Sequence, residues 1–150
     1  MVCSVRQVTA TDPLFAEVSA LFDGYRQHYG ANPAPAATTA WLAAHTGTDR
    51  LRVFAAVDGG TVLGMLTVSV VPASLTLRTF WFIRDLYVAP RARRRGVARG
   101  LLAHVTHAAR AQGAHRLALQ TEVDNVAAGS LYADLGFQPV TDLAQLILPL

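Results

Sequence analysis

Three features of this 150-residue chain predict a single mixed α/β domain. Hydrophobic residues make up 52% of the chain, so a sizeable core can form without disulfides or structural metals. Segments of alternating apolar residues, typical of strands, are interspersed with segments whose apolar residues recur every three or four positions, as on one face of a helix. Cys3 is the only cysteine, which excludes a disulfide framework within the chain and favours a reducing cytoplasm.

Strand and helix patterns alternate along the whole chain. Asp12 and Pro13 supply an N-cap and a first helical residue, and Gly113 stands where a later helix should end. A hairpin turn is predicted over residues 58–60. We expect helices over residues 13–27, 38–45 and 96–112. We expect strands over residues 4–9, 52–57, 61–70, the segment that follows residue 74 and ends at 88, and 145–150.

The most informative segment is residues 85–99, which read DLYVAPRARRRGVAR. An apolar run and a proline lead into an arginine-rich turn, and Gly96 stands at the start of a helix. The first N–H groups of a helix have no intrahelical acceptor, and glycine allows a ligand to approach the backbone closely. An arginine cluster at a helix start opposes the helix dipole, which disfavours a plain solvated face. The turn therefore predicts a phosphate site formed by Arg93, Arg94, Arg95, Gly96, Val97, Ala98 and Arg99.

Missing motifs narrow the kind of ligand and partner. The chain contains no lysine and no GxxxxGK[ST] motif, which argues against a nucleoside-triphosphatase loop. No GxGxxG follows the first strand, which argues against a dinucleotide fold. The net charge of +3 is concentrated in the arginine turn, and no aromatic residues are interleaved with it, so nucleic acid is not an expected partner. The longest apolar run, residues 62–71, is too short to span a membrane.

The arginine turn fits the pattern V-x-P-x-x-[QR]-x-x-G-x-[GA] at Val88, Pro90, Arg93, Gly96 and Ala98. This pattern resembles the acetyl-CoA pyrophosphate loop of the GCN5-related N-acetyltransferase (GNAT) family. A second segment, GAHRLALQTEVDNVAAGSLYADLGF, is similar to the strand and helix that follow in that family. The resemblance covers nearly the whole chain. It implies a GNAT-like fold, with a central mixed, mostly antiparallel sheet of six to seven strands flanked by about four helices. Beyond the elements predicted from the patterns, the resemblance implies a strand around residues 117–119 and a helix over residues 127–135.

The resemblance also assigns roles to residues at matching positions. The backbone N–H groups of Leu86, Tyr87 and Val88 would bind the pantetheine arm, with the Val88 N–H as donor to the acetyl oxygen. Tyr132, in the LYADLGF segment, would protonate the departing thiolate; a half-buried ring packed in the core is the alternative. Asn125 would hold the pantetheine amides, cap the following helix, or do both.

The sequence leaves the general base open. Phe82, Arg84 and Gln120 occupy the positions that match the family's glutamate, which departs from the family pattern. Asp85 and Glu122 are the remaining catalytic candidates because both lie at predicted strand ends. Asp85 could instead form an ion pair with Arg84, Glu122 could be a solvated loop charge, and a water chain could accept the proton.

These expectations describe an N-acetyltransferase that uses acetyl-CoA as a cosubstrate. His104 and His107 lie three residues apart, but no carboxylate or cysteine at matching spacing completes a metal site, so no metal is expected. The acetyl group would pass to a primary amine of a small molecule or protein in one ternary complex, since Cys3 lies far from both motifs. The alternative is a non-catalytic module that binds a phosphate or nucleic acid through the arginine turn. The apolar C-terminal segment also suits a homodimer.

The motifs do not identify the amine acceptor. Tyr25, Tyr29 and Trp41, in and after the first predicted helix, and Trp81 either wall an acceptor site or pack in the core. If Asp85 faces that site, it attracts a cationic amine.

Overall fold

A computed structural model describes residues 3–150 of the chain. The chain forms two compact units, Met1–Gln120 and Thr121–Leu150. The first unit carries one sheet and three α-helices, and the second carries one α-helix. No helix among the described residues is long and apolar enough to cross a membrane.

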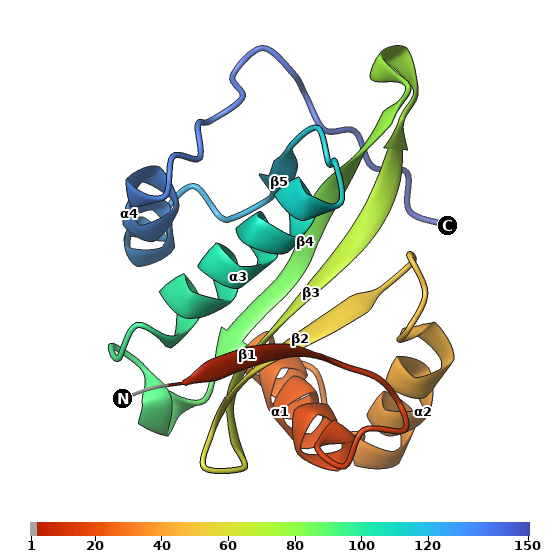
Figure 1. The fold of residues 1–150 in the computed structure, drawn as a ribbon, viewed down its shortest axis with the longest axis vertical. Helices are drawn as coiled ribbons and strands as arrows, with labels where there is room; N and C mark the ends of the chain where they lie inside the picture. Colours follow the sequence, from red (N-terminus) through yellow and green to blue (C-terminus); the bar gives the residue numbers. More distant parts are fainter. Residues whose placement is uncertain (1–2) are drawn as a thin grey trace. The chain divides into compact units, whose positions relative to one another are not determined.

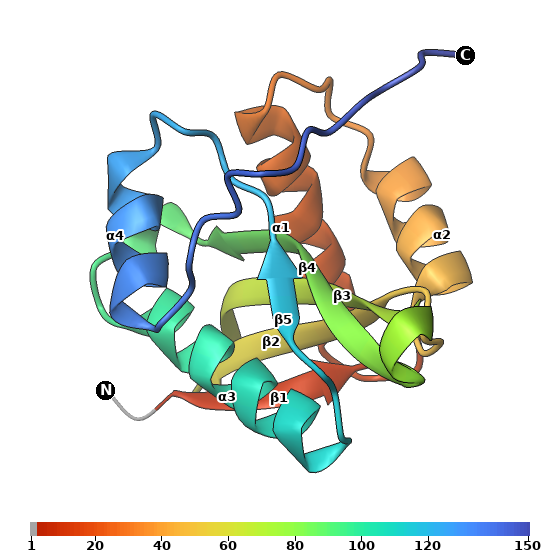
Figure 2. The same cartoon turned by 90° about the horizontal axis from the view of Figure 1, so that it is seen from above.

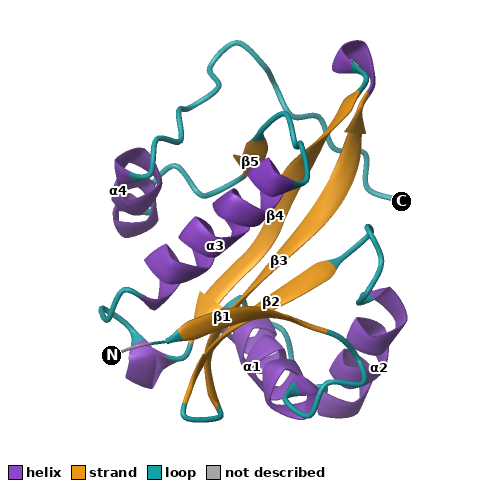
Figure 3. Ribbon diagram, viewed as in Figure 1, coloured by secondary structure: helices purple, strands orange, loops and turns teal. Residues whose placement is uncertain are grey.

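The first unit is built on a sheet whose strands lie side by side in chain order (Figure 1). The strands are β1 (Ser4–Val8), β2 (Arg52–Asp58), β3 (Thr61–Ala73), β4 (Arg78–Val88) and β5 (Leu117–Leu119). The first four pair antiparallel with their neighbours, and β5 pairs parallel with β4. A mixed, mostly antiparallel sheet is confirmed, but it has five strands among the described residues rather than six to seven. β3 and β4 extend together to the short 3₁₀ turn Ser74–Thr76 that joins them (Figure 3).

Three helices of this unit cover the two faces of the sheet. They are α1 (Phe15–His28), α2 (Pro35–His45) and α3 (Val97–Ala111). α3 packs on one face, and α1 packs on the opposite face with α2 beside it (Figure 2). α1 begins two residues later than predicted, because Asp12 closes a turn before the helix: its Oδ1 accepts the Leu14 N–H at 2.9 Å and pairs with Arg6.

The core has one layer on each face of the sheet. Gly64 of β3 allows α3 to approach closely, since an added Cβ would lie 3.0 Å from Val97 Cγ1 and 3.3 Å from Leu101 Cδ1. The predicted apolar face of α3 is confirmed, and its buried residues are Val97, Leu101, Leu102, Val105 and Ala109. The layer under α1 and α2 includes Val18, Phe22, Leu42, Val53 and Met65.

β4 contains a bulge at Arg84. Thr67 of β3 pairs with Asp85, and the next residue, Val68, pairs with Ile83, so Arg84 has no partner on β3. Side chains alternate between the faces of a strand, so without the bulge Asp85 would share the face of Ile83, under α3. The extra residue turns Asp85 to the other face, toward α1.

The second unit consists of α4 (Val126–Asp134) followed by irregular chain to Leu150. Asn125 caps this helix, since its Oδ1 accepts the Ala128 N–H at 3.2 Å. The predicted helix is confirmed with a start one residue earlier. The predicted strand over residues 145–150 is wrong: these residues are exposed and have no strand conformation. An apolar run forms a strand only where its backbone finds a partner, and Pro149 removes one donor from this run.

Candidate active site

The arginine turn between β4 and α3 presents its charge to solvent. Arg94 and Gly96 both have positive φ, 60° and 79°, so two residues of the turn are left-handed just before α3 begins. Arg93 is fixed, because its Nε donates to Val88 O at 3.1 Å and its guanidinium lies 5.4 Å from the Tyr87 ring centroid. Arg94 and Arg95 are exposed and form no ion pair with any residue of 3–150. The turn thus combines a held arginine with two whose charge is available to an anion.

One edge of β4 is open beside this turn. β5 pairs only with residues 81–83 of β4, so among the described residues the stretch 84–88 has a neighbouring strand on its β3 side alone. Ala89 N–H donates to Leu63 O at 2.8 Å, across to the β3 side. Successive N–H groups of a strand point to opposite edges, so the Val88 and Leu86 N–H groups point to the open edge. The Tyr87 N–H points to β3.

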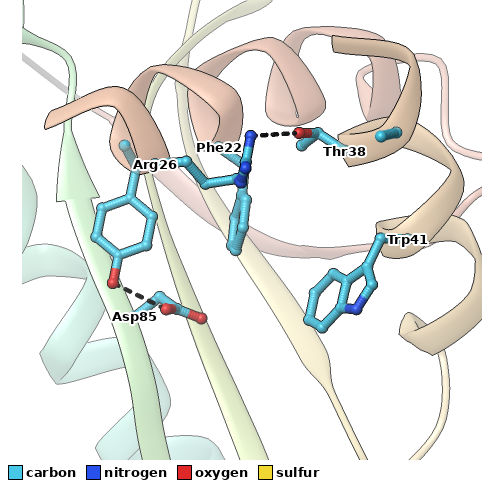
Figure 4. Close-up of a pocket in the computed structure, with 7 residues that line it drawn as sticks. Phe22, Arg26, Thr38, Trp41 and Asp85 are labelled. Carbon is cyan, nitrogen blue, oxygen red and sulfur yellow. Dashed lines mark hydrogen bonds between the residues drawn. The ribbon is translucent and has the colours of Figure 1, made fainter. Parts of the chain in front are cut away.

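Asp85 lies in a pocket on the α1 face of the sheet. Its Oδ1 accepts the Tyr25 hydroxyl at 2.9 Å, and its Oδ2 accepts a short hydrogen bond from the Thr67 hydroxyl. The alternative role for Asp85, an ion pair with Arg84, is not formed: Arg84 stacks over Phe82, and no described cation pairs with Asp85. The pocket has a volume of about 410 Å³ and is lined by Phe22, Tyr25, Arg26, Ala37, Thr38, Trp41 and Asp85 (Figure 4).

A second carboxylate, Asp23, lies behind the pocket and joins α1 to α2. It is buried, and its oxygens accept hydrogen bonds from the Thr38 hydroxyl at 2.8 Å, the Arg26 guanidinium at 2.8 Å and the Ala34 N–H at 3.2 Å. Burial acts to raise the pKa of Asp23, but these hydrogen bonds and one from Gln27 outweigh it and hold the pKa below its ordinary value. Asp23 therefore stays ionised at neutral pH and fixes the position of Arg26.

The aromatic residues divide between the pocket and the core. Trp41 is 48% exposed at the pocket, where its ring stacks on His45 with centroids 4.4 Å apart and lies 6.2 Å from Phe22. Tyr25 also lines the pocket, so these two residues border a cavity, and their role as an acceptor wall stays a prediction. Trp81 does not belong to it: it is 1% exposed and stacks on Phe54, among the residues under α3.

Comparison with known proteins identifies the family. The model of the acetyltransferase (GNAT) family matches residues 16–137. The chain belongs to this family. The uncharacterized N-acetyltransferase YhfO of Bacillus subtilis is 29% identical over 138 residues, which cover 92% of this chain and 91% of YhfO. A crystal structure of a probable acetyltransferase matches with a TM-score of 0.90 at 29% identity, and the match covers 98% of this chain and 97% of that one. The aminoglycoside N(6')-acetyltransferase type 1 of Serratia marcescens is 43% identical over 56 residues, 37% of this chain and 38% of that protein.

Membership confirms the fold class and the activity that the motifs predict. The protein is a GNAT acetyltransferase that uses acetyl-CoA as its cosubstrate. The residues present fit that cosubstrate: the open edge of β4 offers two N–H donors for amide and thioester oxygens, and the adjoining turn offers cationic donors for phosphate.

The predicted site residues of this acetyltransferase fall into both units. Asp85, the strand residues 86–88 and the turn residues 93–99 all belong to the first unit. Glu122, Asn125 and Tyr132 belong to the second. Within that unit Glu122 is exposed, and the half-buried Tyr132 ring packs edge-to-face on Phe137 with centroids 5.7 Å apart. Asn125 caps α4 as one of its two predicted roles requires, and its contact with pantetheine stays a prediction.

Sequence reasoning missed three residues that shape the acetyltransferase pocket. Thr67 could have been found from the sequence, because it is a polar residue in the middle of an apolar strand. It is fully buried in the structure. Asp23 could also have been found, because it is a carboxylate between apolar residues of a predicted helix. Arg26 gave no signal of its own, since an arginine near a helix C-terminus is ordinary on a solvated surface.

Proposed function

We propose that this acetyltransferase transfers acetyl to the amine of a small molecule held beside Asp85. The observation that carries the proposal is a carboxylate without a cationic partner among the described residues, set in a pocket next to the open edge of β4. Asp85 and Val88 are three residues apart on one strand, a distance of about 10 Å. An amine drawn to the carboxylate is therefore within one small molecule's length of the donor proposed for the thioester.

The cosubstrate side of the proposal uses the strand edge and the turn. The Val88 N–H donates to the thioester oxygen and the Leu86 N–H to a pantetheine amide, while the Tyr87 ring supports Arg93. The pyrophosphate is bound by the side chains of Arg94, Arg95 and Arg99 and by the backbone at the start of α3. The residues that complete this backbone surface are Gly96, Val97 and Ala98.

The chemistry is a direct transfer in a ternary complex. The ammonium first loses one proton and becomes a neutral amine. The amine nitrogen then forms a bond to the acetyl carbon as the carbon–sulfur bond breaks, and the second proton that the nitrogen loses balances the one that the thiolate gains. Asp85, which lines the pocket, holds the incoming ammonium and accepts its first proton, directly or through water. Glu122 is the second candidate for the base. Tyr132 is proposed as the proton donor to sulfur from its place in the LYADLGF motif.

The size of the pocket favours a small-molecule acceptor. A volume of about 410 Å³ lies in the range of small-ligand sites, and the lining combines three aromatic rings with few polar groups. One relative is named for acetylating aminoglycosides, which are small-molecule amines. The single cysteine suits a protein of the cytoplasm, which is the location we propose.

An amine screen tests this proposal. The purified protein is incubated with acetyl-CoA and a panel of small-molecule amines, and release of free thiol is followed, with acetyl-CoA binding measured by calorimetry. We expect turnover with at least one amine class and a lower rate for Asp85→Asn at unchanged acetyl-CoA affinity. Binding of acetyl-CoA without turnover on any small amine, or equal turnover by the variant, would contradict the proposal.

A further inference from the structure

The acceptor pocket holds two opposite charges on different walls. Asp85 projects from β4, and Arg26 projects from the last turn of α1; Figure 4 shows the Arg26 guanidinium directed to Thr38, away from Asp85. Among residues 3–150, no other charged side chain lines the pocket. The two charges form no ion pair with each other. Each is therefore available to a complementary group of one bound molecule.

Arg26 keeps part of its hydrogen-bonding capacity. The contacts of its guanidinium all use one nitrogen, NH1, which donates to Asp23 Oδ1 at 2.8 Å and also to Asn32 O and Thr38 Oγ1, each at 3.4 Å. No described residue accepts from its Nε or from its other terminal nitrogen. Those two N–H groups lie on one edge of the planar guanidinium, the edge that binds a carboxylate in a bidentate way. The Arg26 side chain is 34% exposed, so a ligand can reach it.

Asp23 fixes Arg26 without neutralising the pocket. Its carboxylate is shared among four donors, of which Arg26 is one. The ion pair therefore orients the arginine as a recognition group, as a bound carboxylate does for arginines at many anion sites. Asp85, by contrast, accepts hydrogen bonds from two neutral hydroxyls and has no cationic partner among the described residues.

We propose that the acceptor is a zwitterion: an amino acid with an apolar or aromatic body, its ammonium on Asp85 and its carboxylate on the free edge of Arg26. This rests on the proposed function and deepens it. Phe22, Tyr25 and Trp41 supply the apolar surface, and Trp41 is half exposed and able to lose contact with water when a ligand covers it. A polycation such as an aminoglycoside fits poorly, because it brings several positive charges to one carboxylate and one guanidinium.

The test compares matched pairs of acceptors that differ only in the carboxylate. Phenylalanine is compared with phenethylamine, and 4-(aminomethyl)benzoate with benzylamine, so that two spacings between amine and carboxylate are covered; kanamycin is the polycation. We expect the carboxylate member of at least one pair to have a kcat/KM higher by about tenfold to a hundredfold, the effect of a charge-assisted bidentate contact. Kanamycin should be the poorer acceptor.

Arg26→Gln assigns this preference to the arginine. Arg26→Gln should lower kcat/KM for the preferred amino acid by a similar factor and leave kcat/KM for the matched amine within about twofold of the parental value. Arg26→Lys should give a kcat/KM for the amino acid between those of the parental protein and Arg26→Gln. The control is Arg110→Gln, at an exposed arginine of α3, which should change kcat/KM for neither member of the pair. Acetyl-CoA affinity by calorimetry shows that each variant is folded. If Arg26→Gln does not fold, the matched pairs in the parental protein decide the question alone.

The outcomes separate this inference from the proposed function. Equal or better turnover of the carboxylate-free amines, or preference for kanamycin, overturns the zwitterion and leaves the proposed acetyl transfer intact. An equal loss for both members of a pair in Arg26→Gln also overturns it, because the arginine would then be structural. If none of the amine classes gives thiol release, the proposed function itself is overturned.

Discussion

The arginine turn and the acceptor pocket differ in how far along the chain their residues lie. The turn is one continuous segment, residues 93–99, separated from the end of β4 by residues 89–92 alone. The pocket is assembled from α1, α2 and β4, and its central hydrogen bond joins Tyr25 to Asp85 across sixty positions of sequence. A local site tolerates changes elsewhere in the fold, whereas a site assembled from distant segments depends on every contact that holds those segments together.

The largest effect is expected from Gly96→Val in the local site. Gly96 has a φ of 79°, and no atom lies within 4 Å of an added Cβ, so the change strains the turn without a clash in the core. Calorimetry should show acetyl-CoA affinity lower by about 100-fold or more, the loss of at least two charge-assisted hydrogen bonds. Gly113→Val carries similar strain, φ 73°, at the other end of α3 and should leave affinity near parental. Equal loss in both variants would show a general defect of α3.

Tyr132→Phe examines the motif of the second unit. The phenol is proposed as a proton donor, and a positioned donor contributes about 100-fold to the rate. Steady-state kinetics should therefore show kcat reduced by about that factor with little change in the KM for acetyl-CoA. Turnover at the parental rate would leave Tyr132 with the packing role seen against Phe137.

Asp85→Asn tests the acceptor pocket, the site assembled from distant segments. It keeps the shape of the side chain and removes the charge, so the KM for the amine should rise by about tenfold while acetyl-CoA binding stays unchanged. The parental KM should also increase with salt, because screening weakens a partly exposed charge pair. Asp58→Asn, at the exposed end of β2, is the matched control. If Asp85→Asn shows parental kinetics with every accepted amine, Glu122 or a water becomes the better candidate.

The smallest of the expected changes is one of stability, in Asp23→Asn. The folded state lowers the pKa of Asp23 from 3.8, so the charged carboxylate stabilises the fold at neutral pH. This contribution is present above pH 3.8 and is lost as pH falls through the lowered folded pKa. Thermal unfolding should show a lower Tm for the variant at pH 7 and a difference that narrows below pH 3.8. A constant difference across that range would assign the effect to shape rather than charge.

By itself the sequence determined the turn at residues 93–99, the apolar face of α3 and the hairpin between β2 and β3, because each depends on neighbours a few positions away. The family followed from the same local patterns. Apolar composition near the C-terminus was not enough to make a strand, since pairing depends on a partner that composition does not supply.

Only the tertiary structure decided the acceptor pocket. The bulge at Arg84 turns Asp85 toward α1, and a bulge depends on how two strands align rather than on any one residue type. Tertiary packing also separates the two tryptophans near predicted site segments. Trp41 is exposed at the pocket, and Trp81 lies in the core. Side-chain direction and long-range pairing are set by packing, so the groups that recognise the acceptor became visible only when distant segments were brought together.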